Sequence, residues 1–285
     1  MPAALITGAS TGIGRATALR LARSGWTVLA GVRETSAGEQ LAAEPAAGGR
    51  VIPLALEVTD PDQVAQAAER VGELAAGRGR TAGGLDALVN NAGIGVGGPL
   101  ELVAPEDMRR QFDVNVLAQV SVTQAMLPAL RRAHGRIVFI SSIGGRVPTP
   151  FVAPYAASKH AIEALGDALR IELATSHVQV ALVEPGSVAT PIWDKGRAEA
   201  ERVTIPAELQ SEYGHVPAAM EKILEETARR GVPPDAVAET IERALGARRM
   251  RARYLVGRDA KAMLVLKRAL PDRIFDRVLR RALGV

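Results

Sequence analysis

Short apolar runs rich in β-branched residues alternate with longer amphipathic segments along the first two thirds of the chain. The runs are predicted as strands: Ala3–Thr7, Trp26–Val32, Val51–Leu56, Leu85–Asn90, Arg136–Ile140 and Val178–Val183. The predicted helices reach about Ser24 after the first strand, then span Pro61 to about Ala76, Pro105–Arg132 and Ala153–Thr175. Strands alternating with helices of this length form βαβ units with right-handed crossovers. The pattern therefore predicts an α/β fold built on a doubly wound parallel sheet.

A glycine-rich turn, Gly8-Ala-Ser-Thr-Gly12-Ile-Gly14, joins the first predicted strand to the first helix. Glycines permit a tight turn and let backbone N–H groups approach a pyrophosphate at the helix N-terminus, where the dipole favours negative charge. Such a turn alone is a weak signal, because many loops carry glycines. Its position between an N-terminal strand and an amphipathic helix makes it a stronger indication of a nucleotide site.

The second predicted strand ends at Val32-Arg33, where a dinucleotide-binding fold holds the adenosine ribose. An acidic residue there grips the free ribose hydroxyls of NAD, whereas an arginine accommodates the 2′-phosphate of NADP. The chain has a cation and no acid at this point, so NADP(H) is the preferred cofactor and NAD(H) the second choice. The alternative is that Arg33 is a solvated loop residue.

Tyr155 and Lys159 lie four residues apart near the start of the helix predicted over Ala153–Thr175, so they share one of its faces. A free tyrosine has a pKa of about 10, and a lysine ammonium one turn away lowers that pKa toward neutrality. Ser142, after the strand Arg136–Ile140, is placed to hydrogen-bond the substrate oxygen that exchanges a proton with Tyr155. Tyr and Lys alone are more simply two residues of an amphipathic helix. Together with the serine and the glycine-rich turn, they indicate a catalytic group.

Several polar and glycine-containing segments follow directly after predicted strands. Asn90-Asn-Ala-Gly93, Ser142 and Pro185-Gly186 all occupy such positions. Ligands of open parallel sheets bind beyond the carboxyl ends of the strands. These segments are therefore the first candidates for the walls of the site.

The composition excludes several other kinds of protein. The chain has no cysteine, and its four histidines are scattered, so neither a disulfide framework nor a recognisable metal motif is expected. No stretch approaches eighteen uncharged apolar residues, and no signal peptide precedes the first strand, so a soluble cytoplasmic protein is expected. The segment from Arg248 onward carries +9 of charge and the remainder −5. A basic tail on an acidic body gives no sign of a nucleic-acid surface.

The part of the chain beyond Pro191 has a less regular pattern. A flexible substrate-covering loop with Trp193 and Tyr213 is expected over Ile192–Val216, then helices at Ala218–Arg230 and Pro234–Ala247, a strand at Arg253–Gly257, and two amphipathic helices over Ala260–Val285. The favoured interpretation of the basic tail is a helix pair packed on the substrate side or on another subunit. A membrane surface is the alternative, since basic amphipathic helices also bind anionic lipid.

The ordered set of motifs resembles the short-chain dehydrogenase/reductase family. The set consists of Thr7-Gly-x-x-x-Gly12-x-Gly14, Asn90-Asn-Ala-Gly93, Asn115, Ser142, Tyr155-x-x-x-Lys159 and Pro185-Gly186. The resemblance covers roughly Ala3 to Pro191 and implies a Rossmann-type fold that binds NAD(H) or NADP(H). It also implies hydride transfer between the nicotinamide and a carbinol or carbonyl carbon of a small-molecule substrate.

The resemblance implies a role for each matching residue. Tyr155 would be the acid/base, Ser142 would orient the substrate oxygen, Lys159 would lower the tyrosine pKa and bind the nicotinamide ribose, and Asn115 would hold a water of the proton relay. The implied cofactor-binding residues are Gly8, Ser10, Thr11, Gly12, Ile13 and Gly14 at the turn, Arg33, Glu57 and Val58, Asn91, Ala92 and Gly93, Tyr155 and Lys159, and Pro185, Gly186, Val188 and Thr190. Relatives often carry Asp-Val where this chain has Glu57-Val58, which leaves the adenine contact of residue 57 open.

These observations predict a single domain, with residues 1–191 as its dinucleotide-binding and catalytic core and residues 192–285 as a substrate loop and helical extension. The predicted activity is NAD(P)-dependent interconversion of an alcohol and its carbonyl, on a fairly apolar substrate and in a homo-oligomer. The alternatives are a catalytically silent NADP-binding regulator and a protein recruited to a membrane surface.

Overall fold

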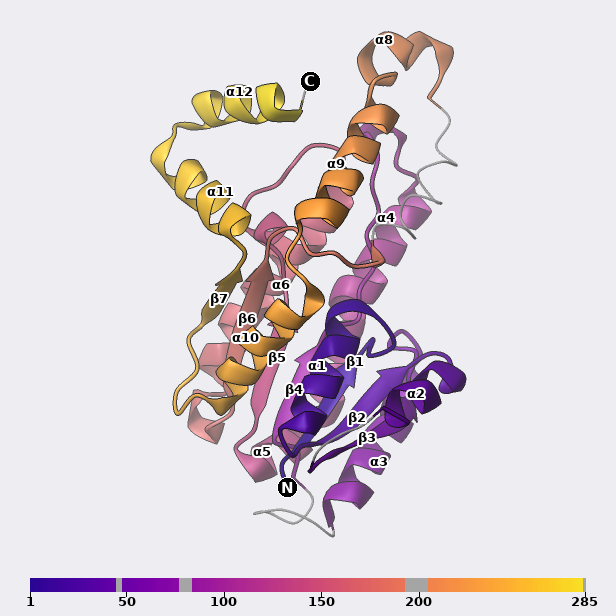
Figure 1. Ribbon diagram of the computed structural model, residues 1–285, viewed down its shortest axis with the longest axis vertical. Helices are drawn as coiled ribbons and strands as arrows, with labels where there is room; N and C mark the ends of the chain where they lie inside the picture. The colour runs from indigo at the N-terminus through magenta and orange to yellow at the C-terminus, as the bar shows by residue number, and fades with distance from the viewer. Residues whose placement is uncertain (45–47, 77–83, 193–204, 284–285) are drawn as a thin grey trace.

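The computed structural model is built on one seven-stranded sheet, and it describes residues 1–44, 48–76, 84–192 and 205–283 (Figure 1). The strands are β1 Ala3–Thr7, β2 Thr27–Val32, β3 Arg50–Ala55, β4 Ala87–Asn90, β5 Arg136–Ile140, β6 Gln179–Pro185 and β7 Arg253–Val256. Their spatial order is β3-β2-β1-β4-β5-β6-β7, and every neighbouring pair is parallel. The order reverses between β1 and β4, which is the switch point where ligands of such sheets bind. The predicted fold class is confirmed.

Helices follow most strands and cover both faces of the sheet. They are α1 Gly12–Arg23, α2 Thr35–Ala42, α3 Pro61–Ala76, α4 Pro105–Phe112, α5 Ala118–Ala133, α6 Ala153–Glu172, α8 Gln210–Tyr213, α9 Val216–Arg230, α10 Pro234–Gly246, α11 Arg258–Ala269 and α12 Asp272–Leu283. Short 3₁₀ turns occur at Leu100–Leu102, Ile143–Gly145, Ala174–Ser176 and Ala207–Leu209, and a π-helical turn at Asp113–Leu117.

Two apolar clusters, one on each side of the sheet, form the core. Successive strand residues point to opposite faces, so Ala4 and Ile6 join one cluster while Leu5 joins the other. The first cluster packs against α1, α2 and α10, and the second against α3, α5 and α6. The inner strands β1, β2, β4, β5 and β6 are buried on both faces, as expected of a parallel sheet between two helical layers. Because all the strands are parallel, their carboxyl ends lie at one edge of the sheet, between the two helical layers.

The short helix α8 lies within the segment that was expected as a loop, and two further details of the helices differ from the sequence-based expectation. The helix predicted over Pro105–Arg132 is divided into α4 and α5 by the π-helical turn, which widens the backbone at Asn115. The helix α2 was not predicted, because its sequence TSAGEQLA has small and polar residues and little apolar periodicity.

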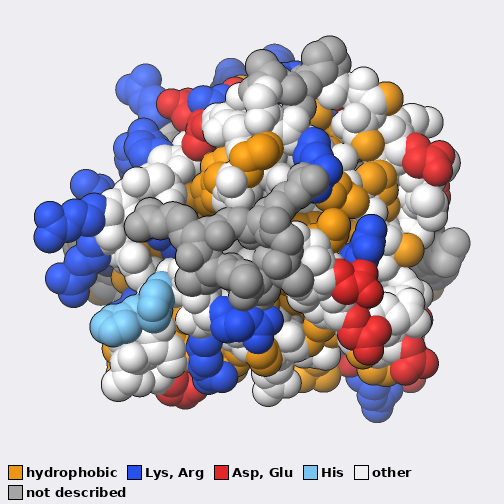
Figure 2. Space-filling view, turned by 90° about the horizontal axis from the view of Figure 1, so that it is seen from below, with side chains coloured by type: hydrophobic (Ala, Val, Ile, Leu, Met, Phe, Trp, Pro, Cys, Tyr) orange, Lys and Arg blue, Asp and Glu red, His pale blue; other side chains and the backbone are white. Residues whose placement is uncertain are grey.

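Four helices stand beyond the carboxyl ends of the strands. In Figure 1, α8 and α9 rise on one side of the upper end and α11 and α12 on the other. The two amphipathic tail helices are confirmed, with a break at Pro271. Among the described residues, no helix is long and apolar enough to cross a membrane. On the opposite end of the molecule, Lys and Arg side chains are most numerous along one edge and others lie nearer the centre of the face, with acidic side chains among them (Figure 2).

Candidate active site

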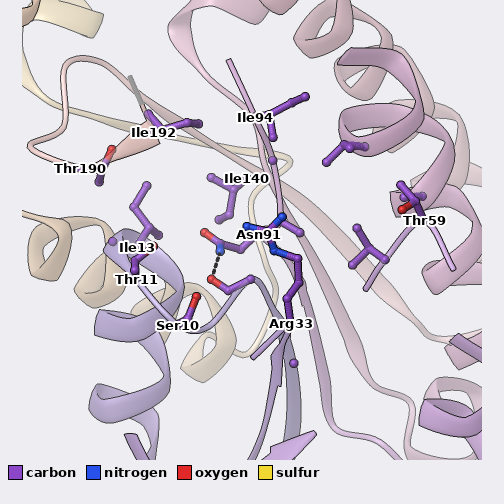
Figure 3. Close-up of a pocket in the computed structure, with 18 of the residues that line it drawn as sticks. Ser10, Thr11, Ile13, Arg33, Thr59, Asn91, Ile94, Ile140, Thr190 and Ile192 are labelled. Atoms are coloured by element: carbon purple, nitrogen blue, oxygen red, sulfur yellow. Dashed lines mark hydrogen bonds between the residues drawn. The ribbon is translucent and has the colours of Figure 1, made fainter. Parts of the chain in front are cut away.

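A cleft of about 710 Å³ opens at the carboxyl ends of the strands and collects most of the predicted site residues (Figure 3). Its walls come from the segments that follow β1, β2, β3, β4, β5 and β6. Of the predicted residues, it is lined by Gly8, Ser10, Thr11, Gly12, Ile13, Arg33, Glu57, Val58, Asn91, Ala92, Gly93, Ser142, Tyr155, Lys159, Pro185, Gly186, Val188 and Thr190. Gly14 and Asn115 do not line it. The fold thus brings together segments that are far apart in the sequence.

The glycine-rich turn depends on a close approach between backbone segments. Gly8 has a φ of +64°, a backbone conformation that residues other than glycine rarely adopt. A Cβ on Gly14 would lie 2.3 Å from the Gly8 carbonyl oxygen and 2.5 Å from Asn91 Nδ2. Gly14 therefore shapes the turn by leaving room for its neighbours.

Asn91 ties this turn to the end of β4. Its side-chain amide donates to the carbonyl oxygens of Thr7 and Gly8, at 2.9 and 3.1 Å. In return, the Thr7 hydroxyl accepts from the backbone N–H groups of Asn91 and Ala92, each at 3.0 Å. The sequence motif at residues 90–93 is thus structural as well as part of the cleft wall.

Ser142, Tyr155 and Lys159 meet on one wall of the cleft. Ser142 follows β5, and its hydroxyl accepts from the N–H of Gly144 at 3.0 Å while forming a hydrogen bond with Tyr155. Lys159 lies one turn after Tyr155 on α6, with its ammonium 5.6 Å from the centre of the tyrosine ring. The ammonium donates to the carbonyl oxygen of Ile140 at 2.7 Å. The expected hydroxyl–hydroxyl–ammonium group is therefore assembled.

The protonation of this group differs from the prediction in one respect. Burial raises the pKa of Tyr155, and the hydrogen bond with Ser142 acts against that rise. This direction is opposite to the one expected from the neighbouring lysine, whose ammonium is directed at the Ile140 carbonyl. Tyr155 is nevertheless partly exposed to the cleft, where a substrate can reach it.

Lys159 is almost fully enclosed, at 3% exposure. Burial lowers its pKa to about 8, with the nearby carboxylate of Glu163 acting in the opposite direction. A cation without its full hydration is therefore held at the wall of the cleft.

Asn115 is fully buried in the π-helical turn, and its side chain is occupied by protein groups. Its Oδ1 accepts from the N–H of Ile94 at 2.8 Å, and its Nδ2 donates to the carbonyl of Ile94 and to Ser158, at 3.0 and 3.2 Å. These contacts hold the segment after β4 against α6. The proposed water-binding role of Asn115 remains a prediction.

Arg33 extends from the end of β2 into the cleft, with its Nη1 4.0 Å from Glu57 (Figure 3). Its side chain is 66% exposed, so the guanidinium has room to meet a ligand. Val32, by contrast, is buried in the core at 1% exposure and does not line the cleft. Arg33 and Glu57 are therefore the charged side chains at this corner of the cleft.

Other residues at the cleft were not predicted as site residues. Ile94, Ile140 and Ile192 add apolar side chains to its walls. Asp259, in the first turn of α11, accepts from the N–H of Ser187 at 2.7 Å and so anchors the segment after β6. That contact spans 72 residues of sequence, and no local pattern announces it.

The expected substrate-covering loop is described only in part. Trp193 lies outside the described residues. Tyr213 donates to Glu101 at 2.9 Å and does not line the cleft. Within the described part of the chain, no group of His, Cys, Asp and Glu is arranged to hold a metal ion.

Comparison with known proteins gives a family match over most of the chain and relatives over nearly all of it. The family described as short chain dehydrogenase matches residues 2–201. Retinol dehydrogenase 5 of Mus musculus is 37% identical, over 96% of this chain and 86% of its own. An NADPH-dependent 3-dehydrocapnine reductase of Ornithobacterium rhinotracheale is 34% identical, over 96% and 95%. A short chain dehydrogenase/reductase of Burkholderia phymatum, solved in complex with NAD, superposes with a TM-score of 0.77 at 29% identity, covering 94% of this chain and 93% of that one.

Proposed function

The chain belongs to the short-chain dehydrogenase family, and from that premise we propose that Ser142, Tyr155 and Lys159 carry its reaction with NADP(H). The reaction class follows from the family: the protein is an oxidoreductase that interconverts an alcohol and its carbonyl with a nicotinamide dinucleotide. The observation that carries the residue assignment is the meeting of these three side chains and the glycine-rich turn in one cleft.

The residues of the cleft fit a nicotinamide dinucleotide. The turn at Gly8–Gly14 lines the cleft at the start of α1, and the N-terminus of a helix is a favourable place for a pyrophosphate. Gly8, Ser10, Thr11 and Ile13 would hold the pyrophosphate and adenosine, Asn91 and Gly93 the ribose, and Pro185, Gly186, Val188 and Thr190 the nicotinamide end. When bound, the nicotinamide supplies or accepts the hydride.

The protein's own side chains donate the proton and stabilise the charge that remains. Because burial raises its pKa, Tyr155 is protonated at neutral pH and is prepared to donate to a carbonyl oxygen during reduction. The Ser142 hydroxyl, already hydrogen-bonded to Tyr155, would orient that oxygen. The Lys159 ammonium, close to the tyrosine ring, would stabilise the phenolate that proton donation leaves behind.

We infer a fairly apolar substrate for this cleft. Ile94, Ile140 and Ile192 supply apolar wall surface. A relative named for retinol, an apolar alcohol, supports the same substrate class. Purified protein should therefore oxidise NADPH only when a carbonyl compound is added, and faster with long apolar aldehydes and ketones than with short polar ones. Absence of oxidation of either NADPH or NADH across such a panel would contradict the proposal.

The preference for NADP(H) rests on Arg33. A guanidinium that meets a 2′-phosphate forms a charge-assisted hydrogen bond of about 1.5–3 kcal/mol. At about 1.4 kcal/mol per decade, one such bond at an exposed site gives a preference of roughly tenfold or more. Arg33→Gln should therefore weaken NADPH binding about tenfold and leave NADH binding nearly unchanged, as measured by fluorescence titration at fixed low salt.

Arg110 provides the matched control for Arg33. It is a second arginine on the cleft wall, and it pairs with Asp107 of its own helix. Arg110→Gln removes the same charge and should leave the NADPH/NADH ratio as in the wild type. Equal affinities for the two cofactors in the wild type, or equal ratios in both variants, would show that Arg33 does not select the cofactor.

We also infer that the protein is a cytoplasmic homo-oligomer. The support is apolar surface on the outer helical layer, where Leu165 and Ile171 of α6 are 38% and 69% exposed. Surface of this kind favours association with a second copy of the chain.

A further inference from the structure

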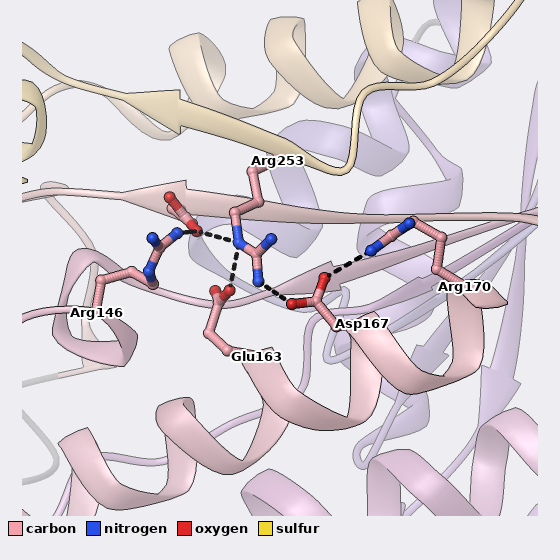
Figure 4. Close-up of polar contacts among 6 residues, drawn as sticks. Arg146, Glu163, Asp167, Arg170 and Arg253 are labelled. Atoms are coloured by element: carbon pink, nitrogen blue, oxygen red, sulfur yellow. Dashed lines mark hydrogen bonds and ion pairs between the residues drawn. The ribbon is translucent and has the colours of Figure 1, made fainter.

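A network of six charged side chains lies behind the cleft wall, between α6 and the last two strands (Figure 4). Its members are Arg146, Glu184, Arg253, Glu163, Asp167 and Arg170, three cations and three carboxylates. They come from the segment after Ser142, from β6, from β7 and from α6. This charged network therefore joins the elements that carry the proposed catalytic residues.

Arg253 is the centre of this charged network. Its Nε lies 2.9 Å from Glu163 and 3.1 Å from Glu184, and its Nη2 lies 2.5 Å from Asp167. Glu184 also accepts from Arg146 at 3.0 Å. One guanidinium on β7 thus holds carboxylates from both β6 and α6, a geometry for which the arginine fork is suited.

The members of this charged network on α6 lie on the same side of the helix as the proposed catalytic residues Tyr155 and Lys159. Tyr155, Lys159, Glu163 and Asp167 follow at intervals of four, so each lies one turn beyond the last on one side of the helix. Glu163 is therefore the carboxylate one turn away from Lys159. A Cβ on Gly145 would lie 3.0 Å from the Lys159 carbonyl and 3.1 Å from Glu163 Cγ, so the loop after Ser142 closes tightly over both.

The two glutamates are deeply buried. The side chain of Glu184 is 0% exposed and that of Glu163 is 7% exposed. One oxygen of each carboxylate has no hydrogen-bond partner among the described residues. A buried charge held this incompletely is a poor source of stability, since its desolvation offsets much of the attraction. The position of Glu163 on α6, one helical turn from Lys159, indicates that it acts on the Lys159 ammonium.

We propose that Glu163 is a positioning residue that acts through Lys159: its carboxylate, paired with Arg253 and one helical turn from Lys159, favours the charged form of the ammonium at the cleft without forming an ion pair with it. This inference rests on the proposed role of Lys159 in the reaction and adds the group that maintains its charge. The carboxylate offsets part of the electrostatic cost of burying the ammonium. The last strand, β7, thereby supports the active site from behind.

The charged groups around this pair come from every element packed on it. On α6, Lys159 is preceded by Tyr155 and followed by Glu163, and Asp167 lies one turn further. Arg253 of β7 contacts Glu163, and Glu184 of β6 shares that arginine. Glu163 is the carboxylate that acts on Lys159, in the direction of a higher lysine pKa.

The test measures the protonation of Lys159 directly, without turnover. The chain has only five lysines, Lys159, Lys195, Lys222, Lys261 and Lys267, so a lysine-labelled sample gives a simple side-chain NMR spectrum. The Lys159 signal is identified by its loss in Lys159→Met. Glu163→Gln keeps the shape and an acceptor for Arg253 but removes the charge. Its Lys159 midpoint should fall by ~1 pH unit from the wild-type value.

Asp167→Asn is the matched control. It removes the same charge and also disturbs a contact of Arg253, but it lies two turns from Lys159. It should leave the Lys159 midpoint at the wild-type value. An unchanged midpoint in Glu163→Gln, or equal shifts in the two variants, would overturn the proposal.

Two further variants keep the test decisive. Arg253 retains Asp167 and Glu184 in Glu163→Gln, so that variant is expected to fold; if it does not, Glu163→Met, apolar and of similar length, carries the same expected shift. NADPH affinity and turnover of Lys159→Met test the proposed function separately. Wild-type values there would contradict the catalytic role of Lys159 while the NMR shift still decides the role of Glu163.

Discussion

Lys159 illustrates how one residue can carry an unfavourable free energy for the sake of a site. Its ammonium has left water for a wall where the Ile140 carbonyl is its hydrogen-bond acceptor, and burial lowers its pKa to about 8. In the unfolded chain, a lysine titrates near 10.5. Between these two values, the unfolded state binds more protons than the native state.

The free energy of unfolding should therefore rise with pH over this window. A depressed native pKa means that stability is gained as the pH rises from about 8 toward 10.5 and is lost as it falls back. Urea unfolding of the wild type and of Lys159→Met at pH 7.5 and 9.5 isolates this contribution. The wild type should gain on the order of 1–2 kcal/mol relative to the variant at the higher pH. A difference between the two proteins that stays constant with pH would contradict the burial of a charged Lys159.

Residue identities could be assigned from the sequence more easily than residue environments. The serine, tyrosine and lysine meet as expected because a strand end and one helix face determine their positions. The raised pKa of Tyr155 and the burial of Val32 were not predicted, because both depend on packing from distant parts of the chain. The same holds for Glu163, which the sequence shows only as one more charge on a helix.

At the scale of elements, the turn from β1 into α1 is the most constrained. Gly14 has no contact with the cleft, yet any side chain there would meet the Gly8 carbonyl and Asn91. The turn, the asparagine and the end of β4 are thus one packed unit. Flexibility of the chain is not what this glycine provides; it provides space.

Gly14→Ala should therefore destabilise the protein by about 1–3 kcal/mol and weaken NADPH and NADH binding together, since the Gly8 carbonyl is backbone and the Asn91 amide is held by its hydrogen bonds to Thr7 and Gly8. Gly72→Ala is the control, because a Cβ there, within α3, would meet open space. It should stabilise the protein by about 0.5–1 kcal/mol. Thermal unfolding and fluorescence titration measure both effects. Equal behaviour of the two alanine variants would contradict the packed turn.

The strands and most helix boundaries followed from apolar periodicity, glycines and prolines, because these act locally. The division of the helix at Asp113–Leu117 did not, since a π-helical turn changes the hydrogen-bond register without changing the apolar pattern. The link from Asp259 to Ser187 also escaped prediction, although it ties the C-terminal extension to the segment after β6. Long-range contacts of this kind leave no periodic signal.

At the scale of the whole molecule, the exposed apolar side chains on α6 are expected to bind a second copy of the chain. Replacing Leu165 and Ile171 together by glutamate should convert an oligomeric wild type into a monomer in sedimentation velocity, because charge is then buried at the contact. Val265→Glu changes a 66% exposed apolar residue on α11 and should leave the assembly intact. A monomeric wild type, or an unchanged assembly in the double variant, would contradict the inferred oligomer.

The central claim is that this cleft transfers a proton through Tyr155 while a nicotinamide dinucleotide exchanges the hydride. Tyr155→Phe removes only the hydroxyl that would carry that proton. Tyr213→Phe removes a hydroxyl that contacts Glu101 outside the cleft, so it is the matched control.

The decisive measurement is carbonyl-dependent NADPH oxidation by both variants, together with their affinity for NADPH. Tyr155→Phe should bind NADPH as the wild type does while its turnover falls by ~10²–10⁴-fold, the usual loss for a general acid/base, and Tyr213→Phe should keep wild-type turnover. Turnover of Tyr155→Phe near the wild-type value would contradict the account.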